Sequence, residues 1–429
     1  MTVWLITVGE PLPGRKERLH RTGLFADYLA CRDNEVIWWT SSFDHFNKKH
    51  IFDRDTTVNV KKNLQLEILH GSGYKRNVSL ARIKDHRQIA EKFSKKSRSI
   101  GVVPEIIVAA LPTIELCVEA VRFGHEKNVP VVLDMRDMWP DIFAKHVPVG
   151  FRWLASIALR SIDKATKSAC GQATAITGIT EKFVDWGLSK AGRMRNEYDE
   201  HFPMSYVHQP APPDDLLLAE KFWREKGIDR DKGQFIVSFV GTIGYQFDLD
   251  LVVLAARELE RRGADIQFVI CGAGERLNHY HKVCKHDRNI LLPGWINAAQ
   301  IQVLLRLSRV GLNPLLERVD LMSTLNNKAV EYFSAGLPVI STPDRGLLRD
   351  FLLNEECGMS VDAGHYMDLA DLLLHLQSDT AKLEALAFNA RRVYEEKFRP
   401  EVVFHEMSEY LDRVVRHHRK LHPESALSV

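Results

Sequence analysis

Short runs of apolar residues alternate with longer amphipathic stretches along almost the whole chain. Several of the short runs are apolar almost without interruption, which is typical of parallel strands covered on both faces. The predicted strands are Val3–Val8, Glu35–Thr40, Leu64–Leu69, Ile106–Ala110, Val131–Asp134, Ala173–Thr177, Phe235–Val240, Ile266–Cys271, Asn289–Leu292, Val310–Asn313, Pro338–Ser341 and Gly358–Val361. The predicted helices between them include Leu19–Cys31, Ile114–Lys127, Leu251–Arg262 and Asn327–Ala335. This alternation predicts right-handed crossover units and doubly wound α/β sheets.

The alternation is interrupted once, near the middle of the chain. Residues 196–215 are polar, contain four prolines and show neither a helical nor a strand period. We therefore predict two domains, residues 1–200 and 216–398, joined by a linker at 201–215. The final segment, 399–429, is predicted to form a helix that packs back on the first domain. The length of 429 residues suits two cores of about 200 residues each.

Composition and charge narrow the class of protein. Apolar residues make up 45% of the chain, which excludes a predominantly disordered protein. The net charge of +2 combines +7 over residues 1–200 with −5 over 201–429, and nine basic side chains lie between Lys75 and Arg98. That stretch is either a solvated helix face or a surface for an anionic partner, such as a phosphorylated substrate or a membrane. No nucleic-acid motif accompanies it, so nucleic acid is not an expected partner.

Cysteine usage and the N-terminus indicate a cytoplasmic protein. The six cysteines form no CxxC pair and no regular framework, which is typical of reduced thiols. The N-terminal sequence has no basic region before its apolar run, so it is not read as a signal peptide. The most apolar stretch, Ile106–Val121, is interrupted by Pro112, Glu115 and Glu119, and no membrane span is expected.

The loop after the first predicted strand is a candidate anion-binding loop. Gly14 permits close approach of the backbone to a ligand, and the helix that follows presents its N-terminus to anions. Arg15, Arg18 and Arg21 make the loop strongly basic. The structural alternative is a flexible surface loop.

The loop after the fifth predicted strand, Asp134–Asp141, combines carboxylates with an arginine. Such charges at a strand end are costly unless they are exposed or paired with one another. One of these carboxylates could orient or deprotonate a hydroxyl group, and Arg136 could hold a phosphate. The alternative is an arginine–aspartate pair that ties down the loop.

Small residues follow two strands of the second half. Gly241, Thr242 and Gly244 end one strand just before a helix, and Gly272 and Gly274 occupy the equivalent place in the next unit. Loops of this kind offer backbone N–H groups to phosphates.

The strongest local signal lies between Met322 and Ile340. Ser323 and Thr324 are predicted to cap a helix. Lys328 lies near the start of that helix, where a cation is disfavoured by the helix dipole unless an anion is bound. Glu331, one turn further on, could accept two hydrogen bonds from a ribose diol.

At these motifs the sequence resembles the family-4 retaining glycosyltransferases of the GT-B fold, in the branch that builds bacterial O-antigens, capsules and other surface polysaccharides. The matching segments are GYKRNVSLARIKDH near residue 73, DMRDMWPD, FVGTIG, FVICGAGE, LLPGW and NNKAVEYFSAGLPVIS. They span nearly the whole chain. The resemblance implies two Rossmann-like, doubly wound domains that face a central cleft, the first binding the acceptor and the second a nucleotide sugar.

The resemblance also implies roles for individual residues. The donor, a UDP- or GDP-linked sugar, would have its diphosphate and sugar contacted by Gly241, Thr242, Gly244, Ser323, Thr324, Asn327 and Lys328. The base would be bordered by Gly272, Gly274, Gly294 and Trp295, and Glu331 would hold the ribose. On the acceptor or phosphate side, the expected residues are Gly14, Arg15, Arg18 and Arg21. Arg136, Asp137 and Lys328 are the expected catalytic residues.

The sequence departs from the family pattern in two places. Ser323 stands where the first glutamate of the family's Glu-x7-Glu motif is expected, eight positions before Glu331. The usual Arg and Lys after the glycine loop are replaced by the segment Tyr245–Asp248. Neutralisation of the diphosphate is then expected from Lys328, Arg318 or Arg345.

The predicted function is retaining transfer of a hexosyl or N-acetylhexosaminyl group to a saccharide or isoprenoid-diphosphate-linked acceptor. No metal or other cofactor is expected, because the sequence has no HExxH, no spaced histidine pair and no Asp-x-Asp at a donor-side strand end. The alternatives are a nucleotide-sugar epimerase or phosphorylase of the same fold, and a non-catalytic binder that regulates or scaffolds an assembly.

A peripheral contact with the inner face of the cytoplasmic membrane is also expected. The stretch Phe151–Lys167 places Trp153 and Leu154 among basic residues, as an interfacial helix does. Packing of that helix on its own sheet is the alternative.

Overall fold

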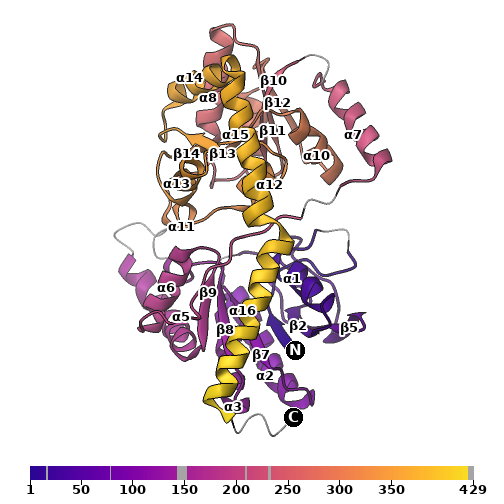
Figure 1. Ribbon diagram of the computed structural model, residues 1–429, viewed down its shortest axis with the longest axis vertical. Helices are drawn as coiled ribbons and strands as arrows, with labels where there is room; N and C mark the ends of the chain where they lie inside the picture. The colour runs from indigo at the N-terminus through magenta and orange to yellow at the C-terminus, as the bar shows by residue number, and fades with distance from the viewer. Residues whose placement is uncertain (16–17, 78, 143–151, 208–209, 230–232, 424–429) are drawn as a thin grey trace. The chain divides into compact units, whose positions relative to one another are not determined.

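The computed structural model describes residues 1–429 except 16–17, 78, 143–151, 208–209, 230–232 and 424–429. The chain divides into two compact units, each with its own sheet (Figure 1). We call residues 1–203 with 403–429 the N-unit, and residues 204–402 the C-unit. Within the described residues, no helix combines the length and the apolar character needed to cross a membrane.

The N-unit is built on a sheet of the order β5-β6-β2-β1-β7-β8-β9. Its strands are β1 (Thr2–Ile6), β2 (Glu35–Ser41), β5 (Thr56–Lys61), β6 (Leu64–Leu69), β7 (Ile106–Leu111), β8 (Val131–Met135) and β9 (Ala175–Gly178). All neighbours pair in parallel except β5, which runs antiparallel to β6 at the edge. The parallel strands are buried almost throughout because helices cover both faces.

Alternation along the strands sends side chains to two separate layers of the N-unit. Trp4 and Trp39 pack with Phe93 and Phe123, which come from the helices on one face. The helices of the unit are α1 (Arg21–Ala30), α2 (Leu80–Ser99), α3 (Ile114–Lys127), α5 (Arg152–Gln172) and α6 (Glu181–Ala191). A small hairpin, β3 (Phe43–Asp44) with β4 (Lys49–His50), follows the carboxyl end of β2.

The opposite layer of the N-unit is completed by the last helix, α16 (Pro400–Leu421). Val403, Phe404, Met407 and Tyr410 of this helix belong to the same buried cluster as Val3 of β1. From Val403 to Leu421 the chain therefore packs on the N-unit sheet, along which α16 runs in Figure 1. Its apolar positions recur every three or four residues, which aligns them in one stripe.

The C-unit has a wholly parallel sheet of the order β12-β11-β10-β13-β14-β15. Its strands are β10 (Phe235–Val240), β11 (Ile266–Cys271), β12 (Ile290–Gly294), β13 (Val310–Pro314), β14 (Val339–Thr342) and β15 (Gly358–Ser360). The strand order reverses between β10 and β13, and ligands of doubly wound sheets bind beside such a switch point. Both units thus have the predicted doubly wound α/β architecture.

Helices surround the C-unit sheet and bury one large apolar cluster. They are α7 (Pro213–Glu225), α8 (Leu249–Arg261), α9 (Leu277–Val283), α10 (Ala298–Leu307), α11 (Val319–Met322), α12 (Asn327–Ser334), α13 (Leu347–Asn354), α14 (Tyr366–Ser378) and α15 (Thr380–Val393). Helix α15 follows α14 after a break at Asp379, whose side chain caps α15 by accepting from the backbone of Lys382 at 2.9 Å. A second break lies at Arg399, which is extended, and α16 follows it.

The structure differs from one local expectation and adds two elements that were not predicted. Residues 201–215 are not linker throughout, because α7 begins at Pro213, a position where the missing N–H costs nothing. The edge strand β5 was not predicted, because its residues are alternately exposed and half-buried and do not form an apolar run. The hairpin β3–β4 is too short to produce a periodic signal.

The helix expected at the membrane surface is α5. The side chains of Phe151, Trp153, Leu154 and Ile157, which define its expected apolar face, lie outside the described residues. Among those that follow, Arg160 is exposed and Leu159 is half-buried.

Candidate functional site

Two glycine loops pack directly on one another at the carboxyl ends of β10 and β11. The Gly241 amide donates to the Cys271 carbonyl at 3.0 Å, and the Ile243 amide donates to the Ala273 carbonyl at 2.9 Å. A side chain at Gly272 would overlap the Gly241 carbonyl, and both glycines have positive φ. The glycines predicted from the sequence are therefore needed first for contact between the loops, and this contact brings their backbones to one edge of the sheet.

Helix α12 begins beside these loops, but its cap is not the predicted one. The side chain of Asn326, rather than Ser323 or Thr324, accepts a hydrogen bond from the Ala329 amide at 3.1 Å. Ser323 instead ends the short helix α11, and its hydroxyl donates to the Val319 carbonyl at 2.7 Å. The prediction of the cap was wrong because a serine one turn earlier can satisfy a carbonyl of its own helix.

Asn326 is held by an asparagine that the sequence analysis did not single out. Asn313, fully buried at the end of β13, exchanges two side-chain hydrogen bonds with Asn326, at 3.0 and 3.1 Å. An amide pair of this kind fixes the start of α12 against the end of the strand. Its sequence signal is an asparagine at the end of an otherwise apolar strand.

Two side chains of α12 hold both backbone groups of Val240, the last residue of β10. Lys328 donates from its ammonium group to the Val240 carbonyl. One turn later, the hydroxyl of Tyr332 accepts from the Val240 amide at 3.0 Å. Helix α12 is thereby fixed at the point where the first glycine loop begins.

Lys328 is a buried cation in an aromatic surrounding. Its ammonium nitrogen lies 4.0 Å from the centre of the Phe239 ring and 4.9 Å from that of Phe247. Burial lowers the pKa of Lys328 from 10.5 to about 7, although the charge of Glu331 opposes the shift. Among the residues that the structure describes, no carboxylate forms an ion pair with this side chain. Lys328 is thus poised to gain an anionic partner.

Glu331 lies one turn into α12, as the sequence indicates. One of its carboxylate oxygens accepts a hydrogen bond from the Tyr206 hydroxyl at 2.6 Å. The backbone of Tyr206 is in turn held by the Tyr394 hydroxyl, which donates to its carbonyl at 2.8 Å. Tyr206 falls inside the predicted linker, where no functional residue was expected. Its contact with Glu331 was therefore not predicted.

The other expected phosphate-neutralising residues are already paired. Arg318 forms an ion pair with Asp320 at 2.6 Å, and Arg345 pairs with Glu317. Arg276, which follows the second glycine loop and was not predicted, pairs with Asp250 at 3.0 Å. Lys328 therefore remains the best placed of the predicted cations.

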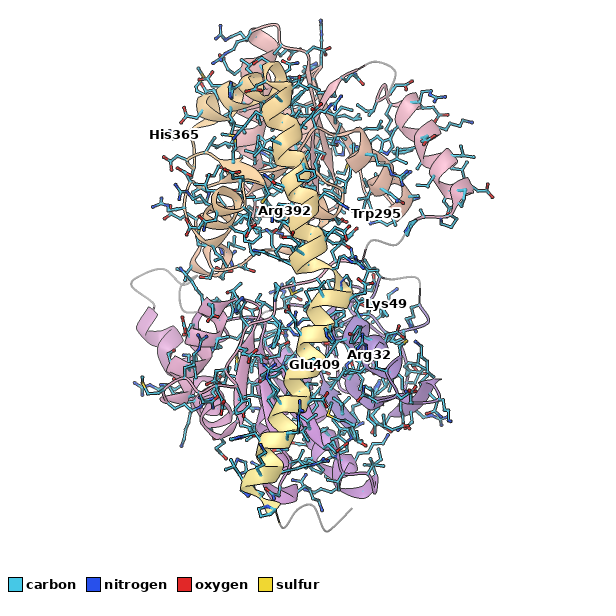
Figure 2. All side chains as sticks on the ribbon, viewed as in Figure 1. Arg32, Lys49, Trp295, His365, Arg392 and Glu409 are labelled. Carbon is cyan, nitrogen blue, oxygen red and sulfur yellow. The ribbon has the colours of Figure 1, made fainter. Side chains whose placement is uncertain are left out.

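The remaining predicted donor residues lie around the same edge. Thr242, Asn327 and Trp295 are exposed, and Trp295 has 73% of its surface accessible (Figure 2). Gly294 precedes Trp295 in the left-handed conformation. Thr324 is half-buried, and Gly244 and Gly274 complete the glycine loops.

In the N-unit, a buried charge network ties the end of β8 to the start of α1. Arg136 donates to Asp134 at 2.7 Å and to Glu10 at 2.5 Å. Arg21 lies 3.4 Å from the same Asp134 carboxylate and donates to the Pro203 carbonyl at 2.7 Å. Arg136 thus pairs with Asp134 and not with Asp137, which is the structural alternative considered for this loop.

The network corrects the role expected for Arg21. Its side chain is only 2% exposed and is bound within the N-unit, so it cannot form part of an exposed anion-binding loop. Burial alone would raise the pKa of Asp134, but the charges of Arg21 and Arg136 outweigh that effect and hold it at about 2. Glu10, which no pattern in the sequence singles out, accepts from the Thr22 hydroxyl at 2.8 Å and joins the network to α1.

Asp137 and the first basic loop keep the positions that the sequence predicts. Asp137 is half-buried just beyond the end of β8, and one of its oxygens accepts from the Met138 amide at 2.8 Å. Gly14, Arg15 and Arg18 are exposed in the loop between β1 and α1. The structure thus leaves Asp137 at the carboxyl edge of the sheet while Arg136 turns inwards.

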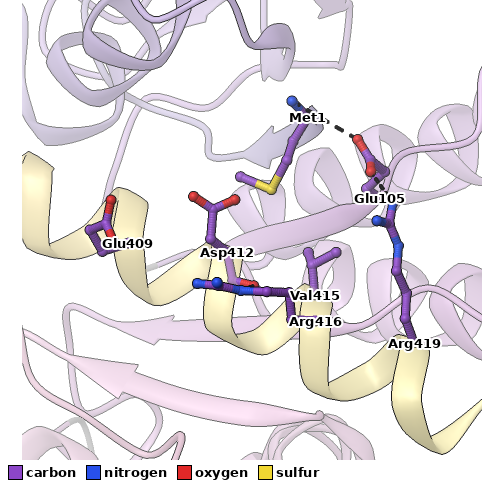
Figure 3. A pocket seen from close by; sticks show the side chains of 7 residues that line it. All are labelled: Met1, Glu105, Glu409, Asp412, Val415, Arg416 and Arg419. Atoms are coloured by element: carbon purple, nitrogen blue, oxygen red, sulfur yellow. Dashed lines mark hydrogen bonds and ion pairs between the residues drawn. The ribbon is translucent and has the colours of Figure 1, made fainter.

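A cavity of about 340 Å³ opens at the other edge of the N-unit sheet (Figure 3). It is lined by Met1, Glu105, Glu409, Asp412, Val415, Arg416 and Arg419. Met1 precedes β1 and Glu105 precedes β7, so the cavity lies at the amino ends of the strands. In the described part of the chain, no three His, Cys, Asp or Glu side chains are arranged to hold a metal ion.

Comparison with known proteins connects this geometry with glycosyl transfer. Residues 234–379, from β10 to the end of α14, match the family model described as glycosyl transferases group 1. A 2-deoxystreptamine N-acetyl-D-glucosaminyltransferase of Niallia circulans is 25% identical over 175 residues, which are 40% of this chain and 43% of that protein. The chain therefore matches less than half the length of this curated relative.

Solved structures share the fold over nearly the whole chain. HepE of Anabaena, crystallised with UDP, has a TM-score of 0.64 and 13% identity, and the match covers 96% of this chain and 100% of that one. WaaG, a glycosyltransferase involved in lipopolysaccharide biosynthesis, has a TM-score of 0.62 and 13% identity, with coverage of 96% and 99%. The predicted GT-B fold is confirmed, as is the likeness to glycosyltransferases at the level of group 1.

Proposed function

We propose that this chain, whose residues 234–379 form a group 1 glycosyl transferase domain, is a retaining family-4 enzyme of bacterial surface polysaccharide synthesis. It transfers a sugar from a nucleoside diphosphate sugar to a saccharide or lipid-linked saccharide. The observation that carries the proposal is Lys328, a buried cation without an ion-pair partner among the described residues, fixed where the glycine loop begins. The UDP bound to HepE and the lipopolysaccharide role of WaaG support the choice of donor and product.

The donor is held by the carboxyl edge of the C-unit sheet. The ammonium group of Lys328 and the N-terminus of α12 bind the diphosphate, because both present positive charge to an anion. The carboxylate of Glu331 accepts hydrogen bonds from the ribose hydroxyls, with Tyr206 fixing its orientation. The exposed ring of Trp295 borders the base.

The chemical step exchanges one bond at the anomeric carbon for another. The bond from this carbon to the diphosphate oxygen breaks, and a bond to the acceptor hydroxyl oxygen forms on the same face. The acceptor proton passes to the departing phosphate. Lys328 stabilises the negative charge on the leaving group, and Asp137 orients the acceptor hydroxyl. No metal ion takes part in this proposal.

The acceptor is bound at the carboxyl edge of the N-unit sheet, where Asp137 follows β8. The enzyme works in the cytoplasm at the inner face of the membrane, where lipid-linked acceptors are found. Helix α5 makes the peripheral contact in this proposal, and the basic stretch Lys75–Arg98 adds positive charge to the same unit.

Binding of UDP, GDP and ADP to the full chain tests the donor site. A nucleotide that fits should raise the melting temperature, since a ligand of the folded state stabilises it by mass action. Calorimetry on Lys328→Met should then show weaker binding, and Lys382→Met, which removes an exposed lysine of α15, should bind like the wild type. Absence of binding to any nucleoside diphosphate would contradict the proposal.

Product analysis tests the reaction itself. With a nucleotide sugar and a saccharide acceptor, nucleoside diphosphate should be released only when the acceptor is present. The anomeric proton of the product should show the same configuration as the donor by NMR. Nucleotide binding without transfer to any acceptor would instead favour a sugar-nucleotide-binding regulator.

A further inference from the structure

Two cations of the N-unit share one aromatic ring. The ammonium nitrogen of Lys48 lies 4.9 Å from the centre of the Tyr74 ring, and the guanidinium carbon of Arg82 lies 5.5 Å from it. Both also bind Asn77: Arg82 donates to its backbone carbonyl at 3.0 Å, and Lys48 donates to its side-chain oxygen. The shared partners hold two like charges close together, and like charges repel each other.

Neither cation forms an ion pair with a carboxylate of the described residues. The charge of Asp44 acts on Lys48 from a greater distance, and those of Asp137, Asp85 and Glu115 act on Arg82. Other basic side chains of the same region differ in this respect, because each forms an ion pair with a carboxylate of the N-unit. The neutralised pairs are Lys92 with Asp55, Lys96 with Glu67 and Arg98 with Glu126. Lys48 and Arg82 are both half-buried.

The positions of both side chains are fixed by the fold. Lys48 has a φ of 56°, a left-handed conformation that is rare for a residue of its kind. The turn that imposes it is closed by Asp44, whose side chain accepts from the Phe46 and Asn47 amides at 2.8 and 2.9 Å. Arg82 lies in the first turn of α2, which the Ser79 hydroxyl caps.

The pair borders the loop that carries Asp137. The guanidinium carbon of Arg82 lies 4.2 Å from the centre of the Trp139 ring, two residues after Asp137. Burial, followed by the charge of Arg82, lowers the pKa of Lys48. His45 donates or accepts a 2.6 Å bond with the Tyr74 hydroxyl, and burial lowers its pKa to about 4, so it adds no charge at neutral pH.

We propose that Lys48 and Arg82 bind a phosphate group carried by the acceptor, beside the Asp137 loop. This inference rests on the proposed function, which supplies the acceptor. A guanidinium and an ammonium group can share the oxygens of one phosphate, and such charge-assisted hydrogen bonds are among the strongest in proteins. The rings of Tyr74 and Trp139 flank the group and limit where the rest of the acceptor can lie.

Binding of octyl phosphate to the full chain tests this site, with octyl glucoside as the uncharged probe. Calorimetry is run with UDP present in excess, so that the donor site is occupied, and again without UDP. Lys48→Gln and Arg82→Gln should each weaken octyl phosphate binding by about tenfold or more. Arg82→Lys keeps the charge and should retain most of the affinity, which separates a binding role from a packing role.

Two matched control variants each remove one positive charge close to the site, from a lysine and from an arginine. Lys49→Gln acts on the exposed neighbour of Lys48 in β4 (Figure 2), and Arg87→Gln acts on an exposed arginine of α2. Both should bind octyl phosphate like the wild type. An equal loss in the controls, or no loss in the Lys48 and Arg82 variants, would overturn the proposal.

Two further arms identify the source of the phosphate. Inorganic phosphate should compete with octyl phosphate in the wild type. Vesicles with anionic phospholipid should bind the wild type and the Lys48→Gln variant alike. Vesicle binding that depends on Lys48 and Arg82, without octyl phosphate binding, would overturn the proposal in favour of a membrane contact.

The two binding measurements also separate this site from the proposed function. If octyl phosphate does not bind but UDP does, the phosphate site is overturned and the proposed function stands. If UDP does not bind but octyl phosphate does, the proposed function is overturned and the phosphate site stands.

Discussion

The ammonium group of Lys328 donates a hydrogen bond to the backbone carbonyl of Val240, 88 residues earlier in the chain. This bond joins the start of α12 to the end of β10, where the first glycine loop begins. It keeps a buried amine at the edge where a diphosphate would bind, and burial lowers the pKa of that amine to about 7. The same side chain is therefore both a structural link and the predicted partner of the donor.

We expect nucleotide affinity to depend on the protonation of Lys328. The amine is charged below pH about 7 and loses its proton above it, so affinity for UDP should fall by up to about tenfold per pH unit above this value. Calorimetry across this range measures the slope. Lys328→Gln should bind weakly at every pH, without the slope, and an identical slope in that variant would contradict the assignment.

The buried amine should also impose a pH dependence on stability. Between pH about 7 and 10.5, the unfolded chain holds a proton on Lys328 that the folded chain has lost. Stability of the wild type should therefore rise with pH, by at most about 1.4 kcal/mol per pH unit, relative to Lys328→Met. Urea unfolding of both proteins at several pH values gives the difference. A difference that stays constant would show that the pKa of Lys328 is not lowered.

Replacement of Glu331 by alanine should weaken binding of a nucleoside diphosphate by about 10- to 100-fold. This is the loss expected for hydrogen bonds to a charged group. The fold should remain intact because Glu331 is only half-buried. Calorimetry measures the affinity, and Glu384→Ala, at an exposed glutamate of α15, is the control. Unchanged affinity would remove the ribose role.

Replacement of Asp137 by asparagine should reduce transfer by about 10²–10⁴-fold, the usual range for a lost acid or base group. Donor affinity should hardly change, because the C-unit supplies it. The reaction is followed by release of nucleoside diphosphate, and Asp185→Asn, at an exposed position of α6, is the control. Near-full transfer with a lowered melting temperature would show that Asp137 only supports its loop.

The Asp134 network should make the stability of the N-unit fall at acid pH. Its carboxyl has a pKa of about 2 in the folded chain and an ordinary value of 3.8, so the stabilisation is complete above pH about 4 and is lost as pH falls through 2. The contribution is roughly 2 kcal/mol. Acid unfolding of the wild type and of Asp134→Asn measures it. The variant should lack this part of the pH dependence and be less stable near neutral pH by about 3–5 kcal/mol.

Activity should survive treatment with EDTA, because the proposed leaving-group stabilisation uses Lys328 and helix N-termini instead of a metal ion. The assay is transfer after exhaustive chelation and removal of the chelator. Loss of activity that magnesium or manganese restores would reveal a cation site that the sequence does not indicate.

The sequence by itself determined the two doubly wound units and most of the residues at their edges. Apolar strands such as Val131–Met135 repeat locally, and the loops that follow them carry their chemistry within a few residues, as Asp137 and Gly241 do. Periodicity and strand ends are properties of short segments, so a single sequence reveals them. The block around Lys328 and Glu331 was visible for the same reason.

Only the tertiary structure decided which charges face one another. Arg136 and Arg21 were both predicted to bind ligands, but both form ion pairs with Asp134 inside the N-unit. Asn326 caps α12 in place of the predicted Ser323, because Asn313 at the end of β13 holds its side chain in position. Lys48 and Arg82 meet on Tyr74 from separate elements. Partners of this kind are far apart in sequence, and the choice among competing carboxylates and amides depends on burial and distance, which only the folded chain sets.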